Sequence, residues 1–233
     1  MKKLYISVKL NLILINVIIE SSYPRKEGII MDISIRPENE NDFKIVENMI
    51  REAFWDLYKP GCVEHLIVHN MRESSDFVRG LDYVACDGNL IVGNIIYSKA
   101  KVINDKNEEF EVLCMGPLGV LPSYQKKGIG SLLMNYSIEK ARQSGYKAII
   151  IFGDPEYYKR FGFINNSEYD IQTSSGENFD AFMALELYNG SLRQVSGKFF
   201  ASDSFETTEE ELEIFEKEFP HKEKHVTETQ FVN

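Results

Sequence analysis

The stretch from Leu118 to Met134, which reads LGVLPSYQKKGIGSLLM, constrains the fold more than any other part of the 233-residue chain. Its first residues close an apolar run that begins near Val112, and Pro122 ends that run because proline has no N–H to donate to a neighbouring strand. From Gly128 onward, apolar residues recur at the three-and-four spacing of a helix with one buried face. The sequence therefore predicts a strand, a loop and a helix in close succession.

The loop between this strand and helix, residues 125–131, contains two glycines and two lysines. Glycines leave backbone amides uncovered, and the first turn of a helix has N–H groups without intrahelical partners. Phosphate oxygens bind such turns, and the helix dipole adds about 0.3–1 kcal/mol per favourable charge. We therefore expect an anion site here. The alternative is that Gly128 and Gly130 only let the helix pack close to the strand.

Two common phosphate-binding loops do not fit this stretch. A Walker loop requires Lys-Ser or Lys-Thr directly after its second glycine, whereas Ser131 and Leu132 follow Gly130. A dinucleotide fingerprint requires a third glycine three residues later, where this chain has Leu133.

Two motifs resemble those of the GCN5-related N-acetyltransferases, the GNAT superfamily. Gln125-Lys126-Lys127-Gly128-Ile129-Gly130 matches the Gln-x-x-Gly-x-Gly signature for acetyl-coenzyme A without a gap. Residues 158–163, YKRFGF, resemble the family's Tyr-x-x-x-Gly-Phe helix, which follows a buried strand. With Gly-Asp-Pro ahead of the paired tyrosines, this string is similar to the YhbS-like branch. Two signatures in the right order make coincidental glycines a poor explanation.

The remaining pattern predicts the other elements of the chain. Apolar alternation predicts a strand near residues 33–37, and Asn41-Asp42 caps a helix over 43–54. A second helix is expected from about Cys62 to Met71. Asp87-Gly88 is a hairpin signal within an antiparallel meander that ends at Val120. Further strands are expected at 148–152, which is apolar throughout, and at 182–187.

The resemblance implies an α/β (α+β) GNAT fold. Its central sheet is mixed and mostly antiparallel, with a V-shaped splay between the fourth and fifth strands and helices on both faces. The strand before the loop and the strand at 148–152 are joined by a helix, which predicts a parallel, right-handed crossover.

The chain divides into three predicted parts. Residues 1–30 contain Lys2-Lys3 followed by an apolar run, which is the outline of a signal peptide. The run is shorter than the roughly 20 residues of a membrane span, and no small-x-small cleavage site follows it. Codons for Lys26-Glu27-Gly28 can contain a ribosome-binding site, so we expect synthesis to start at Met31 and residues 1–30 to be a mis-translated leader or a disordered extension. Residues 31–190 are the expected acetyltransferase domain, and 191–233 a C-terminal extension.

The C-terminal extension carries two structural signals. Gly197–Phe200 is suited to an edge strand, and Thr208 with Glu211 forms the pattern of a capping box. The acidic amphipathic helix that follows has an apolar face containing Phe215 and Phe219. That face docks on the domain or at a dimer contact, and the sequence leaves both open.

The resemblance also implies a binding site. Coenzyme A would lie where the strand ending at Val120 splays from the strand ending at Phe152, with amides of the loop on its pyrophosphate and Lys126 and Lys127 adding charge. Tyr158 would be the general acid that faces the sulfur, and Tyr157 would pack in the core or line the rim. The expected cofactor-binding residues are Leu118, Gly119, Val120, Gln125, Lys126, Lys127, Gly128, Ile129, Gly130 and Ser131. Acetyl-CoA would be a co-substrate, with no metal.

The general base is the weakest part of the resemblance. Several family members have a glutamate where this chain has Cys114, and a buried cysteine is usually inert packing. Glu111 on the same strand, or a chain of waters, is a possible substitute. Asp154 lies near the family's usual asparagine but out of register, so that role is not carried over.

Composition narrows the classes of function. The formal charge of −10 argues against a nucleic-acid partner, because phosphate binding requires a basic face. The three cysteines have no metal-type spacing, and their odd number suits a reduced, cytoplasmic protein. His65 and His69 lie four residues apart without a third ligand nearby, which favours packing over metal binding. We expect no membrane partner, and a homodimer remains open.

Together these features predict a cytoplasmic, bacterial N-acetyltransferase. It would move an acetyl group from acetyl-CoA to a primary amine of a small molecule, or of a protein, by direct attack in a ternary complex. One alternative is a sensor that binds acyl-CoA without catalysis, and another is an interaction protein acting through the helix at residues 208–219. The acceptor depends on residues 54–80 and 165–205, where no motif identifies it.

Overall fold

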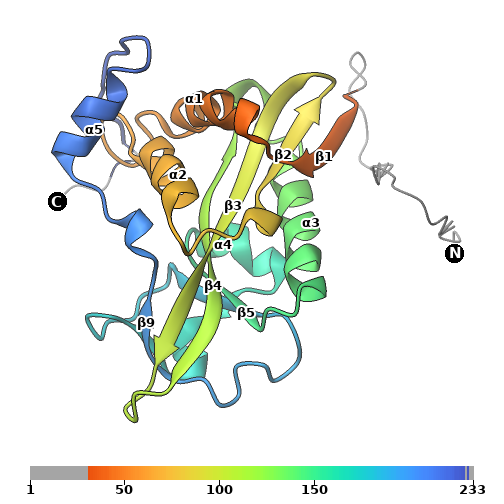
Figure 1. Cartoon of the computed structure of the whole chain (residues 1–233), viewed down its shortest axis with the longest axis vertical. Helices are drawn as coiled ribbons and strands as arrows, with labels where there is room; N and C mark the ends of the chain where they lie inside the picture. The colour runs from red at the N-terminus through yellow and green to blue at the C-terminus, as the bar shows by residue number, and fades with distance from the viewer. Residues whose placement is uncertain (1–30, 229, 231–233) are drawn as a thin grey trace, which may run out of the picture.

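A mixed sheet of nine strands forms the centre of the computed structural model, which describes residues 31–228 and 230 (Figure 1). The leader predicted for residues 1–30 lies outside these residues. Neighbouring strands along the main path are antiparallel except for β4 and β5, which confirms the predicted fold class. That path runs β1 (Ile33–Pro37), β2 (Tyr83–Asp87), β3 (Leu90–Ile103), β4 (Glu109–Val120), β5 (Ala148–Phe152), β8 (Phe182–Glu186) and β6 (Ile164–Asn165).

The fourth and fifth strands separate soon after they meet. They pair only at Leu113 with Ile149 and at Cys114 with Ile150. Beyond that point Gly116 and Pro117 of β4 stand opposite the single residue between Ile95 and Tyr97 on β3. Such a bulge bends the strand that carries the extra residue, and Pro117 has no N–H to continue the ladder. The predicted V-shaped splay is confirmed, and the bulge lies where it opens.

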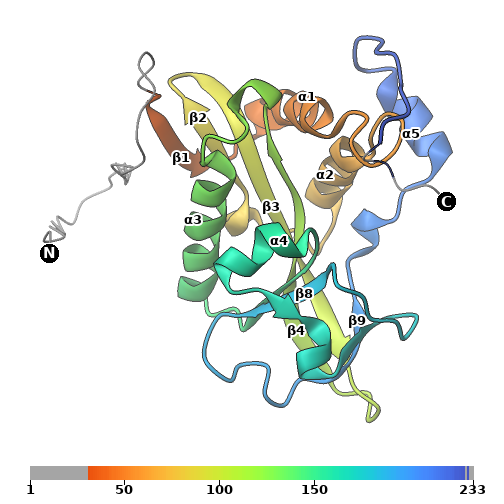
Figure 2. The ribbon, with the colours of Figure 1, turned by 180° about the vertical axis from the view of Figure 1, so that it is seen from behind.

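Helices cover both faces of the sheet (Figures 1 and 2). On one face α1 (Phe43–Phe54) and α2 (Glu64–Glu73) bury Ile50 and Met71 against β2 and β3. On the other face α3 (Ile129–Gln143) buries Leu133 and Met134 among β3, β4 and β5 side chains, beside α4 (Pro155–Tyr158). The splay between β4 and β5 therefore lies between two helical layers.

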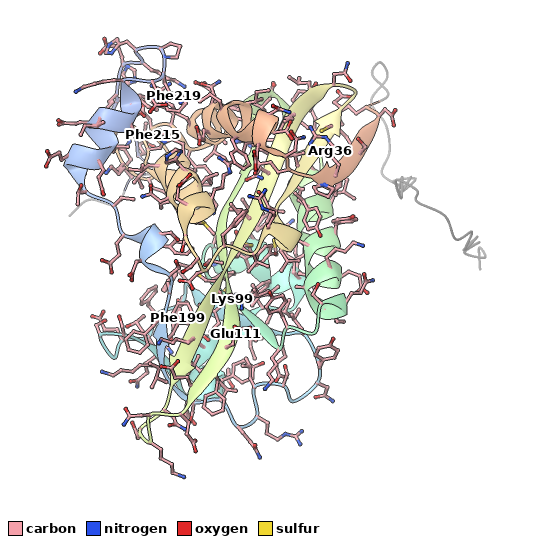
Figure 3. All side chains as sticks on the ribbon, viewed as in Figure 1. Arg36, Lys99, Glu111, Phe199, Phe215 and Phe219 are labelled. Atoms are coloured by element: carbon pink, nitrogen blue, oxygen red, sulfur yellow. The ribbon has the colours of Figure 1, made fainter. Side chains whose placement is uncertain are left out.

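The C-terminal extension packs on its own domain. A strand forms at Gly197–Phe200 (β9), as predicted, but it is not an edge strand, because it lies between β3 and β7 (Ile171–Thr173) and pairs with both. Helix α5 (Glu209–Glu216) starts with the predicted Thr208–Glu211 capping box. Leu212, Phe215 and Phe219 form a buried cluster with Leu66 of α2 (Figure 3). The apolar face of this helix is thus covered within the chain, which removes the basis for an interaction protein acting through that face.

Two stretches differ from the sequence prediction. The cap predicted at Asn41-Asp42 is wrong in detail, because Asn39 caps the short 3₁₀ turn Glu40–Asp42 and Asp42 makes no side-chain capping bond to α1. The segment between α4 and β8 contains the short strands β6 and β7. No helix in the described part of the chain has the length and apolar character needed to cross a membrane.

Candidate functional site

A cavity of about 720 Å³ opens where β4 and β5 separate. The second half of β4 and the loop into α3 form one wall, and the end of β5 with α4 forms another. The third wall comes from the end of α1, the first turns of α2 and Phe205. The expected site residues on these walls are Leu118, Val120, Gln125, Lys126, Gly128, Ile129, Gly130, Ser131 and Tyr158.

Two of the expected residues do not line the cavity. Lys127 places its ammonium 5.0 Å from the ring centre of Tyr124. A Cβ on Gly119 would lie 2.4 Å from Cδ1 of Ile50, so the glycine there lets α1 approach the sheet. Gly119 therefore has a packing role beside α1, and contact of its backbone with coenzyme A stays a prediction.

The loop before α3 presents unpaired backbone amides. Gly128 precedes the helix with φ of 88°, and Lys126 has φ of 60°, both in the left-handed region. No backbone N–H of residues 126–128 donates a hydrogen bond to another residue in the described ranges. The first-turn N–H groups of α3 add to this set because they have no intrahelical partners. Uncovered amides at the start of a helix are a geometry that commonly binds anions. A Cβ on Gly128 would meet nothing within 4 Å. Its backbone conformation, not helix packing, requires the glycine.

Gly130 also has a packing role. A Cβ at this position would lie 2.7 Å from the hydroxyl of Tyr157. The guanidinium of Arg160 stacks 4.3 Å from the centre of the Tyr157 ring, and both residues line the cavity. Burial raises the pKa of Tyr157, and a side-chain hydrogen bond with Ser131 partly opposes this. Tyr157 thus packs against the core and lines the cavity, as predicted, with its hydroxyl beside the first turn of α3.

Tyr158 is held by the turn that precedes it. Asp154 caps α4 by accepting a hydrogen bond from the Glu156 N–H at 2.9 Å. The Tyr158 ring lies so close to Gly153 that a Cβ there would be 2.2 Å from Cε2. No hydrogen bond joins the Tyr158 hydroxyl to another residue in the described part of the chain. Burial raises its pKa, with a smaller contribution from Tyr157, so the hydroxyl is protonated at neutral pH.

Neither base considered from the sequence lies in the cavity. Cys114 does not line the cavity; it is buried in an apolar cluster with Val112, Ile150 and Ala184, and burial raises the pKa of its thiol to about 12. The carboxylate of Glu111 lies 3.1 Å from the ammonium of Lys99 on the exposed part of the β3–β4 hairpin (Figure 3). Cys114 is therefore inert packing, and Glu111 is not placed to accept a proton in the cavity.

Glu64, in the first turn of α2, lines the cavity instead. Its Oε2 accepts a hydrogen bond from the Val63 N–H at 3.0 Å, and burial raises the pKa of the carboxyl group. No sequence motif marks this residue, and only the packing of α2 over β4 brings it to the site.

The two histidines of α2 have packing roles, as the sequence favoured. His65 is fully buried with Nε2 2.8 Å from Glu216, and Nδ1 of His69 lies 2.9 Å from Glu47. Among the residues that the structure describes, no group of three or more His, Cys, Asp or Glu side chains is arranged to hold a metal ion.

The sequence profile of the Acetyltransferase (GNAT) family matches residues 48–163, from α1 to just beyond α4. The chain belongs to the GNAT superfamily. The matched residues include both motifs and most of the residues that line the cavity.

Similar proteins lie in the YhbS-like branch of the GNAT superfamily. The N-acetyltransferase YhbS of Escherichia coli K12 is 26% identical over 163 residues, which cover 70% of this chain and 92% of YhbS. The crystal structure of E. coli YhbS in complex with CoA has a TM-score of 0.67 at 24% identity, covering 78% of this chain and 96% of that chain. A GNAT acetyltransferase from Brucella melitensis in complex with acetyl-CoA has a TM-score of 0.59 at 23% identity, covering 75% and 98%. These structures show that the chain has the GNAT fold.

Proposed function

We propose that this chain is a cytoplasmic N-acetyltransferase that moves an acetyl group from acetyl-CoA to a primary amine by direct attack in a ternary complex. The observation that carries the proposal is one cavity that contains both the open amides before α3 and the Tyr158 hydroxyl. The CoA and acetyl-CoA complexes of the two similar structures support it. The three cysteines are buried free thiols, which suits a reducing compartment.

The residues around the loop fit the chemistry of coenzyme A. The N–H groups of residues 126–131 would bind the pyrophosphate, as helix N-termini commonly do. Lys126 and Arg160 line the same part of the cavity and add positive charge. The β4 residues Leu118 and Val120 would lie along the pantetheine arm. Acetyl-CoA would supply the activated acyl group.

Acetyl transfer requires the amine to be neutral before it attacks. For a lysine-like amine of pKa about 10.4, reaching the neutral form at pH 7 costs about 4.6 kcal/mol. The nitrogen lone pair then forms a bond to the carbonyl carbon while the C–S bond breaks. In our proposal the Tyr158 hydroxyl donates a hydrogen bond to the departing sulfur. A thiol has an ordinary pKa of about 8.5, below the raised pKa of Tyr158, so the transfer of a proton from Tyr158 to the thiolate is unfavourable by itself. It is completed when Tyr158 takes up the proton that the attacking nitrogen loses.

The sensor alternative keeps one supporting observation. Cys114 occupies the position where several GNAT enzymes have a glutamate, and its thiol cannot act as a base. A sensor would bind CoA and acetylate no amine.

Calorimetry with CoA and acetyl-CoA, combined with an assay of CoA release from a panel of amines, tests the proposal. Tyr158→Phe should lower kcat by about a hundredfold or more, because a positioned acid typically contributes 10²–10⁴, and should leave CoA affinity unchanged. Tyr169→Phe is the matched control, since that ring lies outside the cavity. Absence of any binding heat with folded protein would refute the proposal, and tight binding without turnover would favour the sensor.

A further inference from the structure

The cavity has two ends of opposite charge. Among the described residues that line it, the cations Lys126 and Arg160 lie with the α3 loop and the Tyr157 ring that contacts it. The carboxylates of Glu64, in α2, and Asp154, at the start of α4, lie near Tyr58, whose pKa is raised mainly by burial and further by these two charges. The phosphate end is therefore basic, and the region around Tyr58 is acidic.

The acidic end is otherwise apolar. It lies between the end of α1, the start of α2 and the end of β5, against Phe205. The apolar and aromatic residues of its walls are Phe54, Leu57, Tyr58, Ile67, Phe152 and Phe205. A polar amine such as ethanolamine would leave most of this surface against water, whereas an apolar substituent would cover it.

Phe152, on the cavity wall, stacks on Phe179, which extends this apolar surface beyond the cavity. Phe152 and Phe179, which we call the aromatic rim, are 50% and 46% exposed, and their ring centres lie 6.0 Å apart with planes inclined by 27°. Phe152 also stacks on the buried Phe182 at 4.9 Å, which holds the rim in place. Stacked rings that remain half exposed beside a cavity are typical of a binding surface for an aromatic group.

Glu64 is the carboxylate best placed to receive a cation. Asp154 already caps α4, whereas Glu64 uses Oε2 on the Val63 N–H and keeps further acceptor sites on its two oxygens. Burial raises the pKa of Glu64, and the backbone N–H groups of Glu64 and Val63 and the charge of Lys59 oppose this effect. The Lys59 ammonium itself lies 3.0 Å from Glu209 of α5. A raised pKa suits a carboxylate that takes up a proton.

We infer that the acceptor is a primary amine with an apolar, preferably aromatic, body, that Glu64 binds its ammonium group and accepts its proton, and that the aromatic rim binds its body. The inference rests on the proposed acetyl transfer and names the class of its acceptor. One ammonium proton passes to Glu64 and then to solvent. The second is lost as the N–C bond forms and replaces the Tyr158 proton that goes to sulfur. The balance is ammonium plus acetyl-CoA giving acetamide, CoA and one proton.

The test compares kcat/KM for 2-phenylethylamine, butylamine, ethanolamine and glutamate. We expect 2-phenylethylamine to exceed ethanolamine by about tenfold or more, and glutamate to be the poorest because its carboxylates meet Glu64. Glu64→Gln should lower kcat/KM for every amine by about a hundredfold or more without changing CoA affinity. Glu64→Asp, which keeps a carboxylate, should retain more activity than Glu64→Gln. Glu111→Gln is the control, because that exposed carboxylate is outside the cavity.

A second pair of variants tests the rim. Phe152→Ala should reduce the preference for 2-phenylethylamine over ethanolamine several-fold, whereas Phe200→Ala, an exposed ring outside the cavity, should not. A preference for ethanolamine or glutamate, or wild-type turnover in Glu64→Gln, would overturn the inference while leaving acetyl transfer established. Failure of the wild-type protein to bind CoA would overturn both proposals.

Discussion

At the scale of single residues, the position of Tyr158 depends on the absence of a side chain at Gly153. A Cβ there would lie 2.2 Å from Cε2 and 2.8 Å from Cδ2 of the ring, which real structures do not tolerate. The ring has Phe163 and Tyr157 on its other sides, at 5.7 and 5.0 Å between centres, and little room to move. Gly153 thus positions the proposed acid without touching substrate.

We therefore expect Gly153→Ala to lower kcat by about tenfold to a hundredfold, because small displacements of a catalytic group have effects of that size. CoA affinity, measured by calorimetry, should stay near wild type, since the α3 loop is untouched. Gly80→Ala is the matched control, because a Cβ at Gly80 has nothing within 4 Å and its φ is not in the left-handed region. Equal loss in both variants would contradict this role for Gly153.

At the scale of elements, the turn before α3 depends on a left-handed residue. Gly128 has φ of 88° and Gly145, just after the same helix, has φ of 83°; a Cβ at either would meet nothing within 4 Å. The two positions are thus matched in conformation and free space, and they differ in their distance from the proposed phosphate site.

Alanine at either position should cost about 1–2 kcal/mol of stability, since a left-handed conformation is unfavourable for residues with a Cβ. Gly128→Ala should also weaken CoA binding by about tenfold, because the relief of strain turns amides away from the phosphates. Calorimetry and urea unfolding measure the two effects separately. CoA binding that weakens equally in Gly145→Ala would mean that the loss reflects general destabilisation.

The ends of the elements that form the site could be predicted where they depend on the backbone preferences of one or two neighbouring residues. Pro122, Gly128 and the Asp154-Pro155 pair fix the ends of strands and helices through their own backbone preferences, and the structure confirms those ends. Strands β6 and β7, of two and three residues, are too short to show a period.

Contacts between distant segments were not predictable. Glu64 reaches the cavity because α2 packs on β4, where a Cβ on Gly116 would lie 2.6 Å from Sδ of Met71. Gly119 lets Ile50 of α1 approach the sheet, and the residues around Gly119 carry no signal of that contact. Both outcomes depend on side chains far away in the sequence.

At the scale of the whole molecule, the C-terminal extension holds α1 and α2 in place. The guanidinium of Arg51, with only 2% of its side chain exposed, lies 2.8 Å from Glu216 of α5. The indole N–H of Trp55 donates to the Glu223 carbonyl at 2.9 Å, and Lys59 pairs with Glu209 at 3.0 Å. These contacts lie along the end of α1 and the segment that leads from it to Glu64. The C-terminal extension therefore supports the part of the cavity that is proposed to bind the acceptor.

Glu216→Ala should destabilise the fold by about 3–5 kcal/mol, because it leaves the buried Arg51 charge without its partner. Urea unfolding at neutral pH measures this loss. Glu213→Ala, at an exposed position of the same helix, should change stability by less than about 0.5 kcal/mol. Similar losses in the two variants would show that helix α5, and not the pair with Arg51, accounts for the effect.

Acid should destabilise the fold through His65, which lies beside Glu216. Burial lowers the pKa of this histidine from its ordinary 6.5 to about 4, with the nearby Glu216 opposing and Arg51 adding to the effect. The unfolded chain therefore binds a proton below pH 6.5 that the folded chain takes up only near pH 4, so stability falls as pH decreases through that window. His65→Gln should flatten this fall in urea titrations between pH 7 and 5, whereas His221→Gln, an exposed control, should not.

The short pairing between β4 and β5 affects the local stability of the sheet. Only two residue pairs join the half that runs from β1 to β4 to the half formed by β5, β8 and β6. Coenzyme A bound between the separated ends of β4 and β5 would occupy the place of a strand and would contact both halves of the sheet. Amide exchange in β5 and β8 should then be slower with coenzyme A bound in the seam than without it.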